Sequence, residues 1–166
     1  MSNTRFIRDA APGDAAAIAA IYNLHVRGTL VTFEMAEVGE EEMAARIFDV
    51  QSRGLPWLVH VEGDAVLGYA CSGPWKARAA YAHTVESSIY LHEDVRGRGI
   101  GKPLYAALIE RLKAVGIHMV IGGVSLPNAA SIALHEQLGF EYVGTFKEVG
   151  WKFEQWIDVG YWQLRL

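Results

Sequence analysis

The chain has 166 residues, of which 51% are hydrophobic and 20% are charged, and its formal net charge is −4. This length and composition predict one domain, spanning residues 1–166, with a substantial hydrophobic core. The excess of acidic residues argues against a general nucleic-acid-binding protein, which needs many Lys and Arg residues to displace counterions from phosphates.

The first part of the chain reads as a strand, two helices and a pair of strands. Residues 5–9 alternate and predict an opening strand. Apolar residues at helical spacing then predict a helix that starts near Pro12 and ends at Gly28. The next predicted elements are a helix and the two apolar strands of a hairpin, over residues 40–51, 57–61 and 65–72.

The strand predicted over residues 84–92 has two unlike faces. Glu86, Ser88 and Tyr90 fall on one face, whereas the residues between them are mostly apolar. One face is therefore expected in the core, and the other is expected to be wet or chemically active.

The rest of the chain adds two helices and three strands. Leu104, Leu108 and Leu112 mark a helix that ends near Gly116. A strand, a helix and two strands follow, over residues 118–122, 128–138, 140–146 and 153–164. The whole order predicts an α/β fold in which a mixed central β-sheet carries helices on both faces.

The loop before the Leu-rich helix has the composition of an anion-binding site. Residues 95–102, V-R-G-R-G-I-G-K, contain three glycines and three cations. Glycine lets the backbone approach a phosphate closely, and the first N–H groups of the following helix have no partner within the helix. A diphosphate would satisfy these groups.

Two common glycine-rich motifs do not fit this loop. A P-loop is excluded because three residues rather than four separate Gly97 from Gly101, and because Pro103 follows Lys102. A dinucleotide fingerprint would need a glycine in place of Lys102. The remaining pattern, R-x-x-G-x-G over residues 96–101, resembles the R/Q-x-x-G-x-G/A loop with which GNAT-superfamily acyltransferases hold the pyrophosphate of acetyl-CoA.

Basic residues gather in two short stretches of this otherwise acidic chain. Lys76 and Arg78 form one stretch, and the glycine-rich loop contains the other. This local clustering favours a small anionic ligand. A merely solvated charge cluster is the alternative for Lys76 and Arg78.

Glu86 is the candidate general base. Acetyl transfer from a thioester to an amine needs the amine as its free base, and Glu86 lies on the polar strand face, ten residues before Arg96. Its carboxylate is expected to face the cofactor cleft. Partial burial would raise its pKa, and general-base help is worth roughly 10²–10⁴-fold. The alternative is a structural carboxylate paired with Lys76 or Arg78.

A polar stripe is predicted along the last helix. Asn128, Ser131 and His135 fall at i, i+3 and i+7. His135 is a candidate acid for the departing thiolate or an alternative base, and Asn128 is a candidate ligand of the pantetheine amides. Asn128 is equally suited to be a helix N-cap, and an isolated helical histidine is often structural.

Cys71 is the only cysteine, which excludes an internal disulfide framework and favours a reducing cytoplasm. It lies in an apolar strand with no adjacent base, so a small buried hydrophobe is expected, and direct transfer is preferred to an acyl-enzyme.

The six histidines show no metal-ligand spacing, and no metal site is expected. No apolar run reaches the roughly 18 residues of a membrane span, and the N-terminal segment, residues 1–9, does not read as a secretory signal.

Four segments together strongly resemble phosphinothricin N-acetyltransferases, a GNAT branch that acetylates the α-amino group of glutamate-like amino acids. The segments are G-P-W-K-A-R-A-A-Y-A-H-T-V-E-S-S-I-Y-L, R-G-R-G-I-G, L-P-N-A-A-S-I-A-L-H-E-Q-L-G-F and W-I-D-V-G-Y-W-Q-L. The likeness extends from Phe6 to Leu164. It implies a GNAT fold in which acetyl-CoA lies between two splayed parallel strands, here residues 84–92 and 118–122.

The resemblance also implies residue roles. Glu86 would be the base, while His135 stands where the wider superfamily often has a Tyr acid, which leaves open whether His135 acts as acid, base or neither. The cofactor would be held by Ile89, Tyr90, Leu91, Arg96, Gly97, Arg98, Gly99, Ile100, Gly101, Lys102, Asn128 and Ser131. The acceptor, with two acidic groups that Arg and Lys recognise well, would be held by Phe33, Lys76, Arg78, Tyr81, Ser88 and Tyr90.

The sequence therefore predicts an acetyl-CoA-dependent N-acetyltransferase for phosphinothricin, methionine sulfoximine, methionine sulfone or a similar small amino acid. The resemblance implies a homodimer; no nucleic-acid or membrane partner is expected. An enzyme acting on a polyamine or a peptide N-terminus is one alternative, which an acidic groove would favour. A non-catalytic CoA-binding sensor is the other, and the presence of Glu86, His135 and the glycine-rich loop speaks against it.

Overall fold

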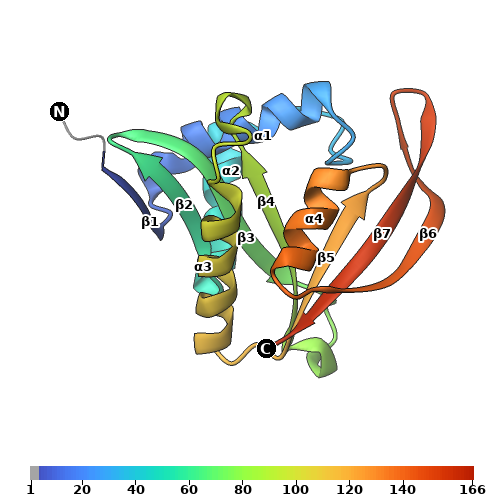
Figure 1. Ribbon diagram of the computed structural model, residues 1–166. Helices are drawn as coiled ribbons and strands as arrows, with labels where there is room; N and C mark the ends of the chain where they lie inside the picture. The colour runs from blue at the N-terminus through green and yellow to red at the C-terminus, as the bar shows by residue number, and fades with distance from the viewer. Residues whose placement is uncertain (1–3) are drawn as a thin grey trace.

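The computed structural model describes residues 4–166 (Figure 1). Residues 1–3, which begin the N-terminal segment discussed above, lie outside the described residues. The elements are β1 (Arg5–Asp9), α1 (Ala15–Gly28), α2 (Glu40–Ser52), β2 (Trp57–Glu62), β3 (Ala65–Pro74), β4 (Thr84–Leu91), α3 (Gly101–Ala114), β5 (Met119–Ser125), α4 (Ala129–Gln137), β6 (Glu141–Lys152) and β7 (Gln155–Arg165). The predicted order of strands and helices is confirmed.

The strands form one seven-stranded sheet in the order β1-β2-β3-β4-β5-β7-β6. Only β4 and β5 are parallel, and all other neighbours are antiparallel. The parallel pairing ends at Glu86 and Ile121, although both strands continue beyond these residues. The two strands therefore diverge and open a gap in the middle of the sheet (Figure 1).

Helices cover both faces of the sheet, as the sequence predicted: α1 and α2 lie on one face, and α3 and α4 lie on the other (Figure 1). Alternate strand residues enter the two cores. In β2, Val59 packs with α1 and α2, whereas Leu58 packs with α3. Leu104, Leu108 and Leu112 of α3 are all fully buried, and each buried leucine side chain contributes about 1.5–3 kcal/mol to folding.

The β6–β7 hairpin differs from the sequence prediction. The last strand was expected to start at residue 153, but β6 extends to Lys152 and β7 starts at Gln155. Phe153 and Glu154 form the turn, with φ of 51° and 57°. A two-residue turn with positive φ normally carries Asn-Gly or Asp-Gly, so the sequence had no turn signal here. The prediction was wrong for this reason.

Candidate active site

A cleft of about 700 Å³ opens where β4 and β5 diverge. One wall comes from the loop after α1, and the other comes from the start of α4. Nine of the predicted site residues line it: Ser88, Ile89, Tyr90, Leu91, Arg96, Gly97, Asn128, Ser131 and His135. The structure thus brings together segments that are far apart in the sequence.

The glycine loop, residues 95–102, lies at one end of this cleft. Gly97 and Gly99 have φ of 75° and 73°, which is the left-handed region that favours glycine. α3 then starts at Gly101 without a side-chain cap, so its first N–H groups are available to an anion. Arg96 and Gly97 line the cleft itself.

The other loop residues have different surroundings. The side chain of Ile100 is buried with Val95 and Leu67, so only its backbone can face a ligand. Arg98 forms an ion pair with Glu62 at 3.5 Å. Lys102 is exposed at the first turn of α3. Arg98, Gly99, Ile100, Gly101 and Lys102 do not line the cleft in this structure.

A second cavity of about 500 Å³ lies on the α2 face of the sheet. Its walls include Glu42, Arg46 and Asp49 from α2, and Glu86 and Ser88 from β4. Ser88 lines both cavities. The cleft and the second cavity therefore share a wall residue on β4, two residues from Glu86.

The Glu86 carboxylate lies at this junction. A Cβ atom at Gly123, which lines the cleft, would stand 3.2 Å from Glu86 Oε1. Burial raises the pKa of Glu86, and neither an ion pair nor a hydrogen bond within residues 4–166 offsets this effect. A carboxylate with a raised pKa that faces a cavity is suited to accept a proton near neutral pH.

His135 is 4% exposed and both of its ring nitrogens are engaged. Nδ1 lies 2.7 Å from the carbonyl oxygen of Ser131, and Nε2 lies 3.1 Å from the hydroxyl of Tyr105. The Tyr105 hydroxyl in turn lies 2.7 Å from Ser87 Oγ. Burial lowers the pKa of His135.

The similarity of this chain to known proteins agrees with this geometry. Residues 7–160 match the family described as Acetyltransferase (GNAT) domain. The chain belongs to the GNAT acetyltransferases. A Pseudomonas aeruginosa L-methionine sulfoximine/L-methionine sulfone acetyltransferase is 42% identical over 162 residues, covering 96% of this chain and 94% of that protein.

Two solved structures are similar throughout. An acetyltransferase of Salmonella typhimurium, determined with acetyl-CoA, is 37% identical, with a TM-score of 0.96 and coverage of 99% of this chain and 95% of that one. A phosphinothricin acetyltransferase of Sinorhizobium meliloti in complex with acetyl-CoA is 38% identical, with a TM-score of 0.94 and coverage of 100% and 89%. The GNAT fold predicted from the sequence is therefore confirmed, with its splayed strands β4 and β5.

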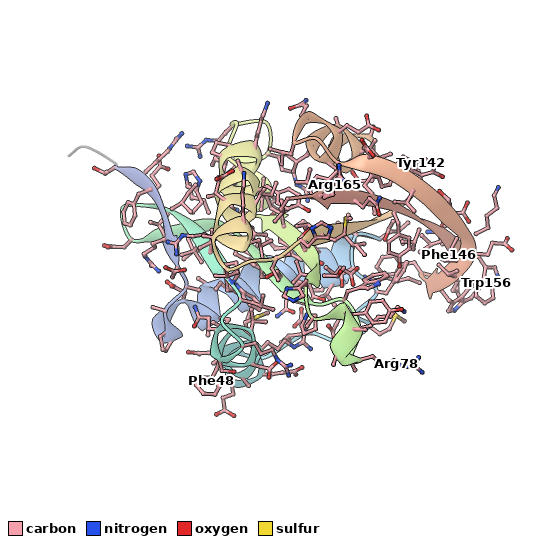
Figure 2. The ribbon with its side chains drawn as sticks, turned by 90° about the horizontal axis from the view of Figure 1, so that it is seen from below. Phe48, Arg78, Tyr142, Phe146, Trp156 and Arg165 are labelled. Carbon is pink, nitrogen blue, oxygen red and sulfur yellow. The ribbon has the colours of Figure 1, made fainter. Side chains whose placement is uncertain are left out.

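The residues expected to bind the acceptor are dispersed in this GNAT chain. Lys76, Arg78 and Tyr81 are exposed between β3 and β4 and line neither cavity. Lys76 Nζ lies 5.1 Å from the Trp75 ring, and Arg78 points away from the protein (Figure 2). The alternative in which these cations pair with Glu86 is not observed among residues 4–166.

Of the other three acceptor candidates, Ser88 and Tyr90 line the cleft, whereas Phe33 lines neither cavity. Ser88 and Tyr90 share the strand face of Glu86, and Tyr90 packs edge-on against Tyr22 with ring centroids 5.1 Å apart. Phe33, from the loop between α1 and α2, lies against β6, where a Cβ at Gly150 would come within 2.2 Å of its ring.

The start of α4 shows that one residue can serve two purposes. Asn128 is the N-cap of α4, and its Oδ1 accepts a hydrogen bond from the Ser131 N–H at 3.1 Å. Its place in the cleft lining leaves it able to contact a ligand as well. The structural alternative for Asn128 is therefore confirmed.

Cys71 is half-buried against the α1–α2 core and lines the second cavity. Burial raises the pKa of its thiol to about 12, which leaves very little thiolate at neutral pH. Between residues 4 and 166, no group of three or more His, Cys, Asp or Glu side chains is arranged to hold a metal ion. No helix in that same range has the length and apolar character needed to cross a membrane.

Sequence reasoning missed several residues of the cleft, among them Ser87, Tyr105 and His25. Ser87 was assigned to the apolar strand face, and Tyr105 lies within the leucine pattern of α3. His25 of α1 lines the cleft, and its Nε2 lies 3.0 Å from the carbonyl oxygen of Leu91. Nothing in the local pattern distinguishes them, because their partners lie on other elements.

Proposed function

We propose that this protein is an acetyl-CoA-dependent N-acetyltransferase that acetylates the α-amino group of a small amino acid such as phosphinothricin, methionine sulfoximine or methionine sulfone. The names of the relatives support this substrate class. The observation that carries the proposal is that Ser88, two residues from Glu86, lines both cavities. A thioester in one cavity and an amine in the other would have a base between them.

Acetyl-CoA fits the cleft by its chemistry. The uncapped N–H groups at the start of α3, with Arg96 and Gly97, suit a diphosphate. Beyond Glu86, the backbone of β4 has no partner on β5, so Ile89 and Leu91, which alternate with the β3-paired Tyr90, direct backbone groups to that side, where the pantetheine amides would lie. Asn128 and Ser131 border the same stretch of the cleft.

The chemistry assigned to Glu86 is proton removal. Its ionised carboxylate accepts a proton from the ammonium form of the acceptor, which leaves a nitrogen lone pair. That lone pair forms a bond to the thioester carbonyl carbon, and the carbon–sulfur bond breaks. CoA departs with the sulfur electron pair and takes up a proton, while the acetylated nitrogen loses its second proton.

The amino-acid pocket is the less complete part of the site. We assign Phe33, Lys76, Arg78, Tyr81, Ser88 and Tyr90 to it, following the family resemblance. Lys76, Arg78 and Tyr81 are exposed and line neither cavity. Their role therefore requires that the rim closes on the acceptor or that a second subunit completes the pocket.

The charge of the second cavity favours one alternative acceptor. Glu42, Asp49 and Glu86 line it, and its one lining cation within the described chain, Arg46, is already paired with Glu34 and Glu42. An acidic wall attracts cations. A polyamine or a peptide N-terminus is therefore the second candidate acceptor.

The deciding experiment follows thiol release from acetyl-CoA with phosphinothricin, methionine sulfoximine, methionine sulfone, spermidine and short peptides. We expect release with one or more of the three amino acids. Release only with spermidine or peptides would favour the second candidate. No release with any amine, combined with tight CoA binding, would favour a CoA sensor.

We also propose a cytoplasmic homodimer. The β6–β7 hairpin exposes large apolar side chains, among them Tyr142, Phe146 and Trp156, which are 57%, 63% and 61% exposed (Figure 2). Apolar exposure of this kind is typical of surfaces that bind protein. Sedimentation velocity should give a dimer, and Trp156→Arg should shift the protein toward monomer, whereas a monomeric parent protein would contradict the proposal.

A further inference from the structure

Three polar side chains are buried at the point where β4 and β5 separate. Ser87 comes from β4, Tyr105 from α3 and His135 from α4, and they are 5%, 0% and 4% exposed. Hydrogen bonds link Ser87 to Tyr105 at 2.7 Å and Tyr105 to His135 at 3.1 Å. All three line the cleft. Buried polar groups of this kind are stable only when their bonds are satisfied, as they are here.

The hydrogen bonds of His135 define its state. The Ser131 carbonyl can only accept, so the proton of the neutral ring is on Nδ1. Nε2 is then the acceptor for the Tyr105 hydroxyl, and that hydroxyl can accept from Ser87. The ring therefore has no proton free for a departing thiolate and no lone pair free for an amine.

The cluster fills the apex of the opening between the strands. Gly122 follows Ile121, the last residue of β5 that pairs with β4, and a Cβ at Gly122 would come within 2.4 Å of His135 Nε2. Ser87 Oγ lies 3.4 Å from the Ile121 carbonyl oxygen. Side chains thus fill the space between the two strands where the backbone pairing stops.

We propose that Ser87, Tyr105 and His135, called the spacer cluster below, set the separation of β4 and β5, and that His135 is a positioning residue rather than the acid or base of the reaction. The cluster lies on the α3 side of β4, opposite the face that carries Glu86. It shapes the cleft without taking the acceptor proton. This inference rests on the proposed function only in that CoA occupies the cleft.

The first test needs no substitution. ¹⁵N NMR of the histidine rings in the whole protein should show His135 neutral at pH 7, with its proton on Nδ1. A His135 ring that is charged at pH 7, or that carries its proton on Nε2, would overturn the proposal.

The second test distinguishes a positioning role of His135 from a catalytic role by the size of the loss in activity. Tyr105→Phe keeps the ring and removes one hydrogen bond, so it should raise the Kd for CoA about three- to tenfold and change kcat by less. His135→Gln retains an acceptor for Tyr105, so its kcat/KM should fall less than about tenfold with an unchanged pH profile. If His135 were the general acid or base, His135→Gln would instead lower kcat/KM by roughly 10²–10⁴-fold and remove one limb of the pH profile. That result would contradict a positioning role.

The control is His118→Gln, because His118 is exposed and lies outside the cleft. CoA binding by calorimetry and thiol release are measured on the parent protein first. A parent that binds no CoA defeats the proposed function. A parent that binds and turns over, with a His135→Gln variant that binds CoA normally but has lost its turnover, defeats only the positioning role.

Discussion

The cleft between β4 and β5 and the β6–β7 hairpin are shaped by different parts of the chain. In the cleft and the glycine loop at its end the backbone dominates, because β4 and β5 stop pairing after Glu86 and because Gly97 and Gly99 adopt positive φ. In the hairpin, long-range side-chain contacts dominate: the Phe33 ring covers Gly150, and Lys152 Nζ donates to the Thr32 carbonyl at 2.8 Å. A region of the first kind depends on local residue types, whereas a region of the second kind depends on partners far away in the sequence.

The two regions also differ in the backbone strain that they carry. Positive φ in the glycine loop costs little, because glycine lacks a Cβ atom. In the hairpin, Glu148, Phe153 and Glu154 have φ of 53°, 51° and 57°, and each non-glycine residue in this region costs roughly 1–2 kcal/mol. The hairpin therefore needs its contacts with the rest of the protein, while the loop is prepared by its own sequence.

The largest effect is expected for Glu86→Gln. Loss of the base should lower kcat/KM by roughly 10²–10⁴-fold at neutral pH and by less at alkaline pH, where free amine is abundant. Burial raises the pKa of Glu86. As the pH is lowered, the parent protein should therefore lose activity at a pH above the ordinary pKa of a glutamate. Thiol release measured against pH tests both points, with the exposed Glu141→Gln as control. An equal loss at every pH would speak against proton removal by Glu86.

The next effect concerns the glycine loop. An alanine Cβ at Gly99 would meet no atom within 4 Å, so Gly99→Ala tests the backbone alone. The left-handed conformation costs a non-glycine residue roughly 1–2 kcal/mol, and we expect CoA affinity to fall about five- to thirtyfold as a result. Gly13→Ala, also in open space but without positive φ, should bind CoA like the parent. Calorimetry of both variants checks this, and equal affinities would mean that the loop conformation does not limit binding.

What could be predicted from the sequence follows the same division between local residue types and distant partners. The loop, the two faces of β4 and the N-cap Asn128 were predictable, because residue type and spacing alone specify them. The turn at Phe153 was not, because no turn residue is present. Neither was the engagement of His135, since Tyr105 belongs to another helix and looks like part of its apolar stripe. The sequence shows which polar groups are present, but not which distant residues form hydrogen bonds with them.

A smaller effect, on stability, is expected from substitutions at two buried histidines, His60 and His135. His135 has both nitrogens bonded, whereas within residues 4–166 neither nitrogen of His60 has a partner. Burial lowers the pKa of both rings, so the folded state resists protonation. Their contribution to stability is present above the unfolded pKa of about 6.5 and is lost as the pH falls below it.

His60→Leu should therefore raise the free energy of unfolding by about 1–2 kcal/mol and weaken its decline below pH 6.5. His135→Leu should lower that free energy, because it leaves the buried Tyr105 hydroxyl without its acceptor. Urea unfolding at several pH values measures both. A destabilised His60→Leu protein would mean that the His60 ring has a partner in solution.

The smallest effect on stability is expected for Lys152→Met, which tests how the hairpin is attached. Lys152 is 2% exposed, burial lowers its pKa, and within residues 4–166 its ammonium contacts the Thr32 carbonyl and the Phe153 ring but no carboxylate. Replacement of a buried charge by an apolar side chain of similar shape is often neutral, so we expect the free energy of unfolding to change by less than about 1 kcal/mol. The loop that carries Phe33 should nevertheless lose its attachment, and chymotrypsin should cleave after Phe33 several times faster than in the exposed-site control Lys147→Met. Equal cleavage rates would show that the packing of Phe33 on Gly150 suffices, and that the hairpin needs no buried ammonium to hold the loop.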